Sequence, residues 1–160
     1  MNKLSVVGET EPEVRGRIVG TWKLVSAEET LKEGGTRPFP QFGANAKGFL
    51  MYQADGHMSA FLEYPNRPPK GGSIGQTGDE EVTTAHGAFA YCGRYEIDVE
   101  RKQIVHLPEI ATTSGYVGSR QVRPYQFESE RLVFSDVEKD DVAVASWKIV
   151  WEKARQVNLD

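Results

Sequence analysis

The chain has 160 residues, with 19 lysines and arginines against 23 aspartates and glutamates and a formal net charge of −4. This length suits one domain, and the small acidic excess excludes a broad basic surface for nucleic acid and a polybasic membrane anchor. The only cysteine, Cys92, cannot form an intrachain disulfide. The sequence contains no apolar run of about 18 residues and no strong signal-peptide pattern. We therefore expect a cytoplasmic protein.

Residues 1–13 are polar and acidic, and they predict a flexible arm ahead of a single domain over residues 14–155. Residues 14–19 can form a short turn of helix. Beyond them, stretches of alternating apolar and polar residues recur between turn signals and predict strands. The predicted strands are Thr21–Glu28, Lys47–Gln53, His57–Glu63, Phe89–Val99, Gln103–Ile110, Ser119–Phe127, Arg131–Val137 and Val142–Lys153.

About eight short strands joined mostly by short connections predict an all-β fold. Eight antiparallel strands can close into an up-and-down β-barrel that is wide enough for one small ligand. Closure also removes the exposed edge strands that an open sheet would leave. The rival architecture is a two-sheet sandwich.

Two segments interrupt the strand pattern and predict long loops. Leu31–Ala46 and Tyr64–Gly78 are rich in glycine and proline. Residues 79–86 predict a short helix, because acidic residues in the first turn suit the helix dipole and Gly87 can end it. Long loops in a small domain are usually functional, so both loops could form a rim or lid at one mouth of the barrel.

Familiar motifs for catalysis and cofactor binding are absent from the sequence, including the nucleophile elbow, the zinc-protease motif, the phosphate loop and the dinucleotide fingerprint. The histidines His57, His86 and His106 lie in separate segments, and their spacing does not indicate a metal site. Cys92 lies inside a predicted strand and is expected to be a structural thiol. We expect no metal and no cofactor.

The predicted strand at residues 89–99 carries aromatic side chains on one face. We predict that this face points into the barrel and that Arg94 and Glu96 point outward. Gly93 on the inward face leaves space beside two phenols. The inward residues are Phe89, Tyr91, Gly93 and Tyr95.

The predicted strand at residues 119–127 places Gln121 and Arg123 on the same face as Tyr125. An ordinary core face would not carry Arg and Gln, so this face points either outward or into a cavity that binds polar groups. Arg123 is then either a structural residue at the barrel end or a ligand-facing one. His106 alternates with apolar neighbours and is either a satisfied core residue or a general acid or base in a cavity.

The tryptophans lie in the first and last predicted strands, which are neighbours in an up-and-down barrel. Alternation places Trp22, Leu24 and Ser26 on one face of the first strand. In the last strand, Trp147 shares a face with Trp151, and it is the tryptophan that could line a ligand cavity.

Four segments are similar to a known family: GTWKLVSAEE (20–29), GFLMYQADGHMSA (48–60), FAYCGRYEID (89–98) and SRQVRPYQFESERLVFS (119–135). Together they resemble the lipocalin-like domain family of small bacterial and fungal proteins, over residues 18–152. The resemblance implies a lipocalin-like barrel with a short helix after the long loop. One departure is visible: the family often has a His-His-Val-Glu-like stretch, and here only His106 of that pair is matched.

Gly20 and Trp22 resemble the G-x-W signature of lipocalins, whose Trp packs at the barrel floor against an Arg from a late strand. The resemblance makes Arg123 a candidate for that Arg. Microbial lipocalin-like proteins include cofactor-free cyclases, isomerases and pericyclases of natural-product biosynthesis. Such enzymes fold a reactive intermediate in an apolar cavity and polarise it with a few hydrogen-bond donors.

The leading hypothesis is therefore a cofactor-independent cyclase or isomerase, for example a pericyclase such as a Diels–Alderase, acting on a small apolar intermediate. The alternatives are a non-catalytic carrier of a small hydrophobic molecule and a barrel with a filled core. We expect no nucleic-acid or membrane partner and leave a homodimer open. The expected catalytic residues are Gln121, Arg123, His106 and Tyr95. The expected ligand-binding residues are Tyr52, Met58, Tyr91, Tyr125 and Trp147.

Overall fold

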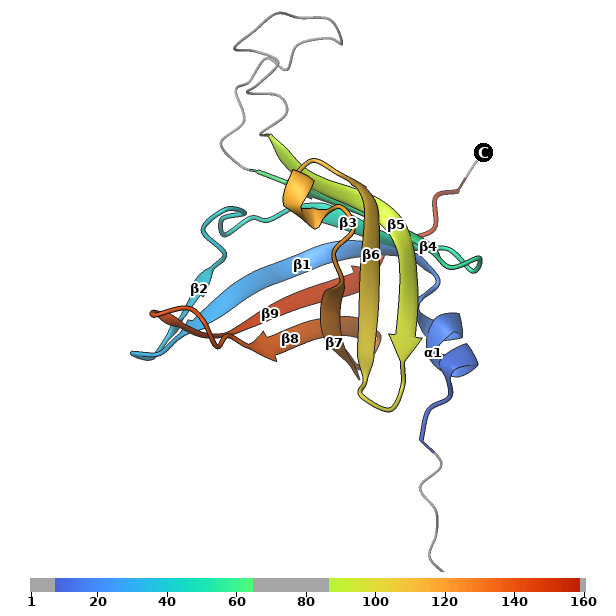
Figure 1. Ribbon diagram of the computed structural model, residues 1–160, viewed down its shortest axis with the longest axis horizontal. Coiled ribbons are helices and arrows are strands. Elements are labelled where there is room, and N and C mark those ends of the chain that lie inside the picture. Colours follow the sequence, from blue (N-terminus) through green and yellow to red (C-terminus); the bar gives the residue numbers. More distant parts are fainter. Residues whose placement is uncertain (1–7, 65–86, 159–160) are drawn as a thin grey trace, which may run out of the picture.

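The computed structural model describes residues 8–64 and 87–158 (Figure 1). These residues form one α-helix, one short 3₁₀ turn and nine strands. The helix is α1 (Glu11–Ile18) and the 3₁₀ turn is η1 (Ser114–Tyr116). The strands are β1 (Gly20–Leu31), β2 (Thr36–Pro38), β3 (Gly48–Tyr52), β4 (His57–Glu63), β5 (Ala88–Asp98), β6 (Gln103–Ala111), β7 (Gln121–Glu128), β8 (Arg131–Val137) and β9 (Val144–Lys153).

The strands form a closed antiparallel barrel. From β1 the order runs through β3, β4, β5, β6, β7, β8 and β9, and β9 pairs again with β1. The short β2 pairs with the far end of β1 and lies outside the ring of eight. The predicted all-β, lipocalin-like barrel of eight strands is therefore confirmed, and the sandwich alternative is excluded.

Most predicted strands lie within three residues of the observed ones, and His57–Glu63 and Arg131–Val137 match at both ends. The prediction that Leu31–Ala46 is entirely loop is wrong, because it contains β2. Proline is tolerated in an edge strand such as this one. The predicted helix at residues 79–86 and nearly all of the predicted loop Tyr64–Gly78 lie outside the described residues.

A bulge in β1 changes which of its residues point inward. Trp22 and Leu24 are buried as predicted, but the pairing with β9 shifts between Leu24 and Ser26. A bulge inserts one extra residue and so reverses the alternation that follows it. Ala27 is therefore buried in place of Ser26, and Glu29 faces the mouth of the barrel.

The inward face predicted for β5 is confirmed. Tyr91 and Tyr95 are buried, whereas Arg94 and Glu96 are exposed. Gly93 is required where β5 approaches β6, because a Cβ atom there would lie 2.1 Å from the carbonyl oxygen of Leu107. Such a distance is far below van der Waals contact, so β5 and β6 could not pair as closely with any other residue.

Helix α1 covers one end of the barrel, beside the end of β5 (Figure 1). It begins at Glu11, inside the stretch that the sequence assigned to an arm. The Thr10 side chain caps the helix and Glu13 completes a capping box, which satisfies two free backbone amides. Val14 and Ile18 are fully buried against the barrel, so α1 closes the barrel floor.

Trp22 packs at this floor, as the G-x-W resemblance implied. Its indole nitrogen donates to the Ile18 carbonyl at 2.7 Å, and the Lys153 ammonium lies 4.4 Å from the ring centroid. The basic residue against Trp22 is thus Lys153 of β9. The assignment of Arg123 to this position is wrong, because Arg123 lines a cavity nearer the other end.

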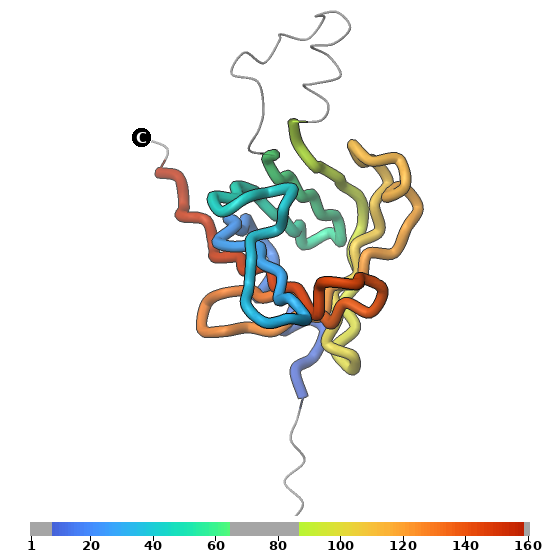
Figure 2. The backbone as a smooth tube through the Cα atoms, turned by 90° about the vertical axis from the view of Figure 1, so that its left-hand side faces the viewer, coloured from blue at the N-terminus to red at the C-terminus, as the bar shows by residue number. Residues whose placement is uncertain are grey.

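The opposite end of the barrel is the mouth. Figure 2 views the molecule from this end and shows the segment that follows β2 running over it.

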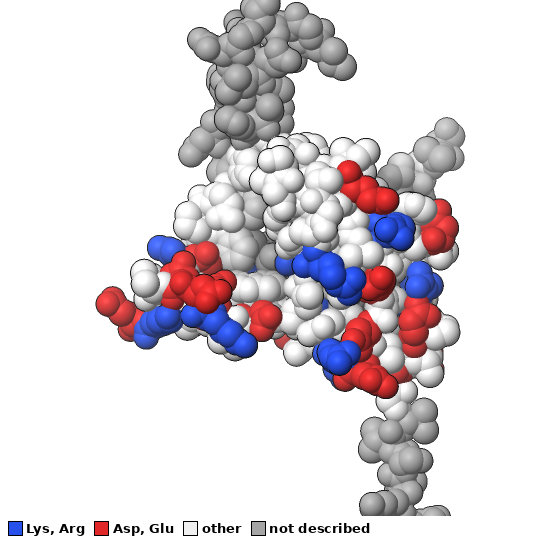
Figure 3. All heavy atoms as spheres, in the orientation of Figure 1, with Lys and Arg blue, Asp and Glu red and all other residues white. Residues whose placement is uncertain are grey.

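In Figure 3, acidic and basic side chains are interspersed on the surface, including those at the turn between β8 and β9. Among the described residues, no helix has the length and apolar character needed to cross a membrane.

Candidate functional site

An inner cavity of about 290 Å³ lies between the core of the barrel and its mouth. Aromatic and aliphatic side chains form most of its wall, among them Phe134 of β8 and Trp151 of β9. The polar side chains in the wall are Gln41, Tyr91, His106, Thr113, Tyr116 and Arg123. The described wall contains no Asp or Glu. A volume near the lower end of the range for ligand pockets indicates a small ligand.

His106 is held between two tyrosines at the base of the inner cavity. Its side chain is 1% exposed. The Tyr52 hydroxyl lies 2.6 Å from His106 Nε2, and the Tyr91 hydroxyl lies 2.7 Å from Nδ1. The three side chains come from β3, β5 and β6, and barrel closure brings these strands together. Both ring nitrogens are therefore satisfied within the core.

Burial keeps this chain of three groups uncharged. It lowers the pKa of His106 well below its ordinary value, and the positive charge of Arg123 lowers it further. Burial also raises the pKa of Tyr52 well above its ordinary value. The pKa of Tyr91 is raised by burial, although Arg123 offsets part of that effect. At neutral pH the site thus contains a neutral imidazole and two neutral phenols.

The hydrogen-bond partners of Tyr52, His106 and Tyr91 indicate which of these groups donates each hydrogen bond. A neutral imidazole has one N–H donor and one acceptor nitrogen. Among the described residues, Tyr52 has His106 as its only hydrogen-bond partner, so the Tyr52 hydroxyl donates to Nε2. The Nδ1–H then donates to the Tyr91 oxygen. The hydroxyl proton of Tyr91 is left to donate elsewhere, and Tyr91 lines the inner cavity.

Arg123 of β7 lies where the inner cavity meets an outer one. The outer cavity has a volume of about 240 Å³ and is lined by Arg123, Trp147 and residues of the mouth. The hydrogen bonds of the guanidinium run to the Tyr116 hydroxyl at 3.4 Å and to the Val122 carbonyl at 3.5 Å, and the Tyr91 hydroxyl also lies beside it. The carbon at its centre lies 6.0 Å from the centroid of the Trp147 ring. Both hydrogen bonds are long, so Arg123 is weakly held.

A family model described as a lipocalin-like domain matches residues 19–154. The chain belongs to the lipocalin-like domain family. No curated protein matches the chain. The barrel of this lipocalin-like domain suits the binding of a small hydrophobic molecule, as the cavity also indicates. Within residues 8–64 and 87–158, no group of three or more His, Cys, Asp or Glu side chains is placed to hold a metal ion.

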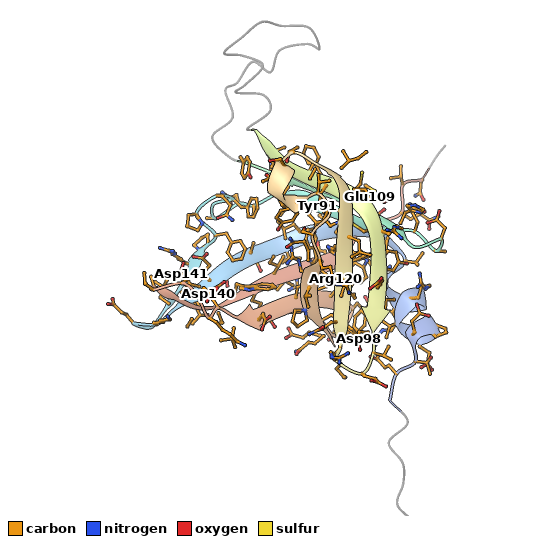
Figure 4. All side chains as sticks on the ribbon, viewed as in Figure 1. Tyr91, Asp98, Glu109, Arg120, Asp140 and Asp141 are labelled. Carbon is orange, nitrogen blue, oxygen red and sulfur yellow. The ribbon has the colours of Figure 1, made fainter. Side chains whose placement is uncertain are left out.

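The lipocalin-like domain brings five of the expected site residues together. His106, Arg123 and Tyr91 line the inner cavity. Tyr52 lies directly behind His106, and Trp147 lines the outer cavity beside Arg123. In Figure 4, Tyr91 is labelled in the upper part of the view of β5, and Asp98 is labelled at the lower end of the same strand.

The other four expected residues lie away from the inner cavity. Tyr95 donates to the Gln53 carbonyl at 2.7 Å, and α1 covers it. The Gln121 amide donates to the Ser119 hydroxyl at 2.9 Å. Met58 and Tyr125 are buried in the core and are not among the lining residues. These four side chains lie on strand faces that the alternation pattern predicted to point inward, but they lie at a different depth along the barrel axis from the inner cavity.

Several lining residues come from the segments that connect strands and were not expected. Phe39 and Phe42 follow β2, and Tyr64 follows β4. The Phe42 and Tyr64 rings stack with centroids 5.7 Å apart. Tyr116 belongs to η1, and the centroid of its ring lies 5.3 Å from that of the Tyr91 ring. The sequence signal that could have found them is the presence of aromatic residues inside glycine- and proline-rich loops.

Proposed function

We propose that this lipocalin-like domain binds a small, mainly apolar molecule that carries a carbonyl group, and that Tyr91 donates a hydrogen bond to that carbonyl. The observation that carries the proposal is the chain Tyr52–His106–Tyr91. Because its other members point their protons along the chain, the Tyr91 hydroxyl is a preorganised donor in a mostly apolar cavity. A donor fixed in a dry site acts more strongly on developing charge than water does.

A polarised carbonyl suits a cyclisation or isomerisation that needs no cofactor. Hydrogen bonding to a conjugated carbonyl withdraws electrons from the adjacent double bond and favours attack on it. The cavity wall can hold a flexible chain in a shape close to that of the transition state. One well-placed donor typically contributes a factor of about 10²–10³ in rate. In this proposal Tyr91 touches the substrate, and His106 and Tyr52 position it.

The proposal favours reactions without net proton transfer. Both nitrogens of His106 are occupied, and the described wall contains no carboxylate that could act as a base. Moving a proton along the chain would leave a buried phenolate at Tyr52, and burial opposes that charge. A pericyclic ring closure fits these conditions. The same lack of a base also favours a second candidate function, a carrier that binds the molecule unchanged.

Binding can be tested with two probes of matched shape, benzylideneacetone and 2-methyl-4-phenylbuta-1,3-diene, in which a CH2 group replaces the carbonyl oxygen. The tryptophans of the two cavities report binding by fluorescence. We expect the ketone to bind more tightly than the hydrocarbon. We also expect the infrared carbonyl stretch of the bound ketone to lie below its position in an apolar solvent. Tyr91→Phe should return that stretch toward the solvent value, and a stretch that does not move would contradict the proposal.

Catalysis can be tested with a linear trienone whose diene and enone ends combine in an intramolecular Diels–Alder reaction. Enzyme function predicts a rate above background that Tyr91→Phe lowers to near background. Tight binding without acceleration would support the carrier function for this class of compound. A role in natural-product biosynthesis and a cytoplasmic location remain predictions from the sequence.

A further inference from the structure

Arg123 lies in the cavity wall and has no carboxylate partner among the described residues. Nine arginines lie in the described residues, and seven of them form an ion pair with Asp or Glu. The two without one in this part of the chain are Arg155 and Arg123. Arg155 is exposed after the last strand, where water solvates its charge. Arg123 is half-buried in the cavity wall, where water can solvate it only in part.

The known contacts of Arg123 use little of its bonding capacity. A guanidinium has five N–H donors arranged to match a carboxylate. Its hydrogen bonds to the Tyr116 hydroxyl and to the Val122 carbonyl are 3.4 and 3.5 Å long. A charge that is moved out of water costs free energy unless it is paired and hydrogen-bonded. The guanidinium of Arg123 therefore lacks an anionic partner among the described residues and has N–H donors without strong hydrogen bonds.

Three acidic residues line the outer cavity, but their carboxylates have other partners. Glu29 is paired with Arg37 at 2.9 Å. Asp141, which is labelled in Figure 4, accepts from two backbone N–H groups, and Glu138 accepts from one. No carboxylate of the described residues lies within 4.0 Å of Arg123. The inner cavity, whose described wall has no acidic residue, is thus the side from which an anion can reach the guanidinium.

We propose that the molecule bound in the inner cavity carries a carboxylate and that Arg123 binds this group, with the Tyr116 hydroxyl beside it. The inference rests on the proposed function and narrows its substrate class to small apolar oxo acids. Arg123 takes the carboxylate, Tyr91 takes the neighbouring carbonyl, and the apolar tail lies against the aromatic wall.

The test adds a third probe, benzylidenepyruvate, in which a carboxylate replaces the methyl group of benzylideneacetone. Calorimetry should show that the acid binds about 10- to 100-fold more tightly than the ketone, because charge-assisted hydrogen bonds are roughly twice as strong as neutral ones. Arg123→Gln should abolish this gain, and Arg123→Lys should keep part of it. Arg120→Gln is the matched control: this nearby arginine is exposed and paired with Glu96, so the gain should persist.

The outcomes separate this inference from the proposed function. Equal affinity of the wild-type protein for acid and ketone would overturn the carboxylate site and leave carbonyl binding intact, and this comparison needs no variant. Failure of both the acid and the ketone to bind better than 2-methyl-4-phenylbuta-1,3-diene would overturn the proposed function as well. If Arg123→Gln is folded by circular dichroism and still binds the acid more tightly than the ketone, another group of the protein binds the carboxylate and the inference is wrong.

Discussion

Substitution of Tyr52 tests whether the chain of three side chains acts as one unit. Tyr52→Phe removes the donor to His106 Nε2, which is buried and has no other partner among the described residues. An orphaned buried acceptor costs about 1–3 kcal/mol. In a protein of this size, 1 kcal/mol lowers the melting temperature by about 2–4 °C. We therefore expect Tyr52→Phe to melt about 2–12 °C below the wild-type protein, as measured by circular dichroism.

Tyr125→Phe is the matched control. Tyr125 is also a buried tyrosine, but its hydroxyl has no hydrogen-bond partner in the described part of the chain. Removal of this hydroxyl leaves no group unsatisfied and should change the melting temperature little or raise it. Equal destabilisation by the two variants would refute the assignment of the Tyr52 hydroxyl as a required donor.

The triple variant Tyr52→Phe, Tyr91→Phe, His106→Leu extends the test. Each single change leaves at least one buried polar group without its partner, whereas the triple change removes all three groups together. Replacing both partners of a buried hydrogen bond by apolar groups can be nearly neutral. The loss of stability in the triple variant should thus be smaller than the sum of the three single losses. An additive result would show that the three side chains do not form a coupled network.

A positioning role for Tyr52 adds a spectroscopic readout. Without Tyr52, the imidazole no longer has a fixed tautomer, and the Tyr91 hydroxyl loses its fixed direction. The carbonyl stretch of bound benzylideneacetone should then shift part of the way toward its value in an apolar solvent. A purely structural role for Tyr52 would lower stability and leave this frequency unchanged.

Three further predictions concern stability. Because burial lowers the pKa of His106, the unfolded state binds a proton at this residue more readily than the folded state does. The free energy of unfolding should therefore not change with pH through His106 above pH ~6.5, and it should fall by up to about 1.4 kcal/mol per pH unit below it. His106→Leu should reduce this slope in denaturation measured over a pH series, and the same slope in the variant would contradict the assignment. Gly93→Ala places a Cβ atom 2.1 Å from the Leu107 carbonyl oxygen, so it should lower the melting temperature sharply or prevent folding, whereas Gly115→Ala meets no atom within 4 Å and should not. Thr10→Ala removes the cap of α1 and should cost about 0.5–2 kcal/mol in urea denaturation, with no change in ligand affinity.

The sequence predicted the barrel because side-chain alternation and turn residues are local properties. The Asp55–Gly56 turn and the alternation around it were enough to define His57–Glu63 at both ends. The bulge after Leu24 was not predictable in this way, because it arises from pairing with β9 at the other end of the chain. The boundary of α1 was missed for a different reason: the capping signal of Thr10 and Glu13 was present but lay in a stretch assigned to the arm.

The candidate site was predicted in part for a related reason. Alternation indicates whether a side chain points inward, but not how deep it lies along the barrel axis. Tyr91 and Tyr95 share a face of β5, yet one lines the cavity and the other contacts α1 at the floor. Depth depends on the tilt of the strands and on their stagger. Contributions from connecting segments, such as Tyr116, depend on how those segments fold over the mouth, and strand patterns carry no information on this.

The pairing of β1 with β9 has a consequence for how the protein is made. Sequence-distant pairings are slow to form, because the long intervening chain must lose conformational entropy first. Trp151, which lines the inner cavity, lies on β9, so the cavity has no complete wall until β9 has left the ribosome. Before that point, the apolar side chains of β1 and β8 face solvent and their backbone edges are unpaired. The nascent chain therefore passes through a stage that is prone to aggregation, and closure of the barrel both ends that stage and creates the binding site.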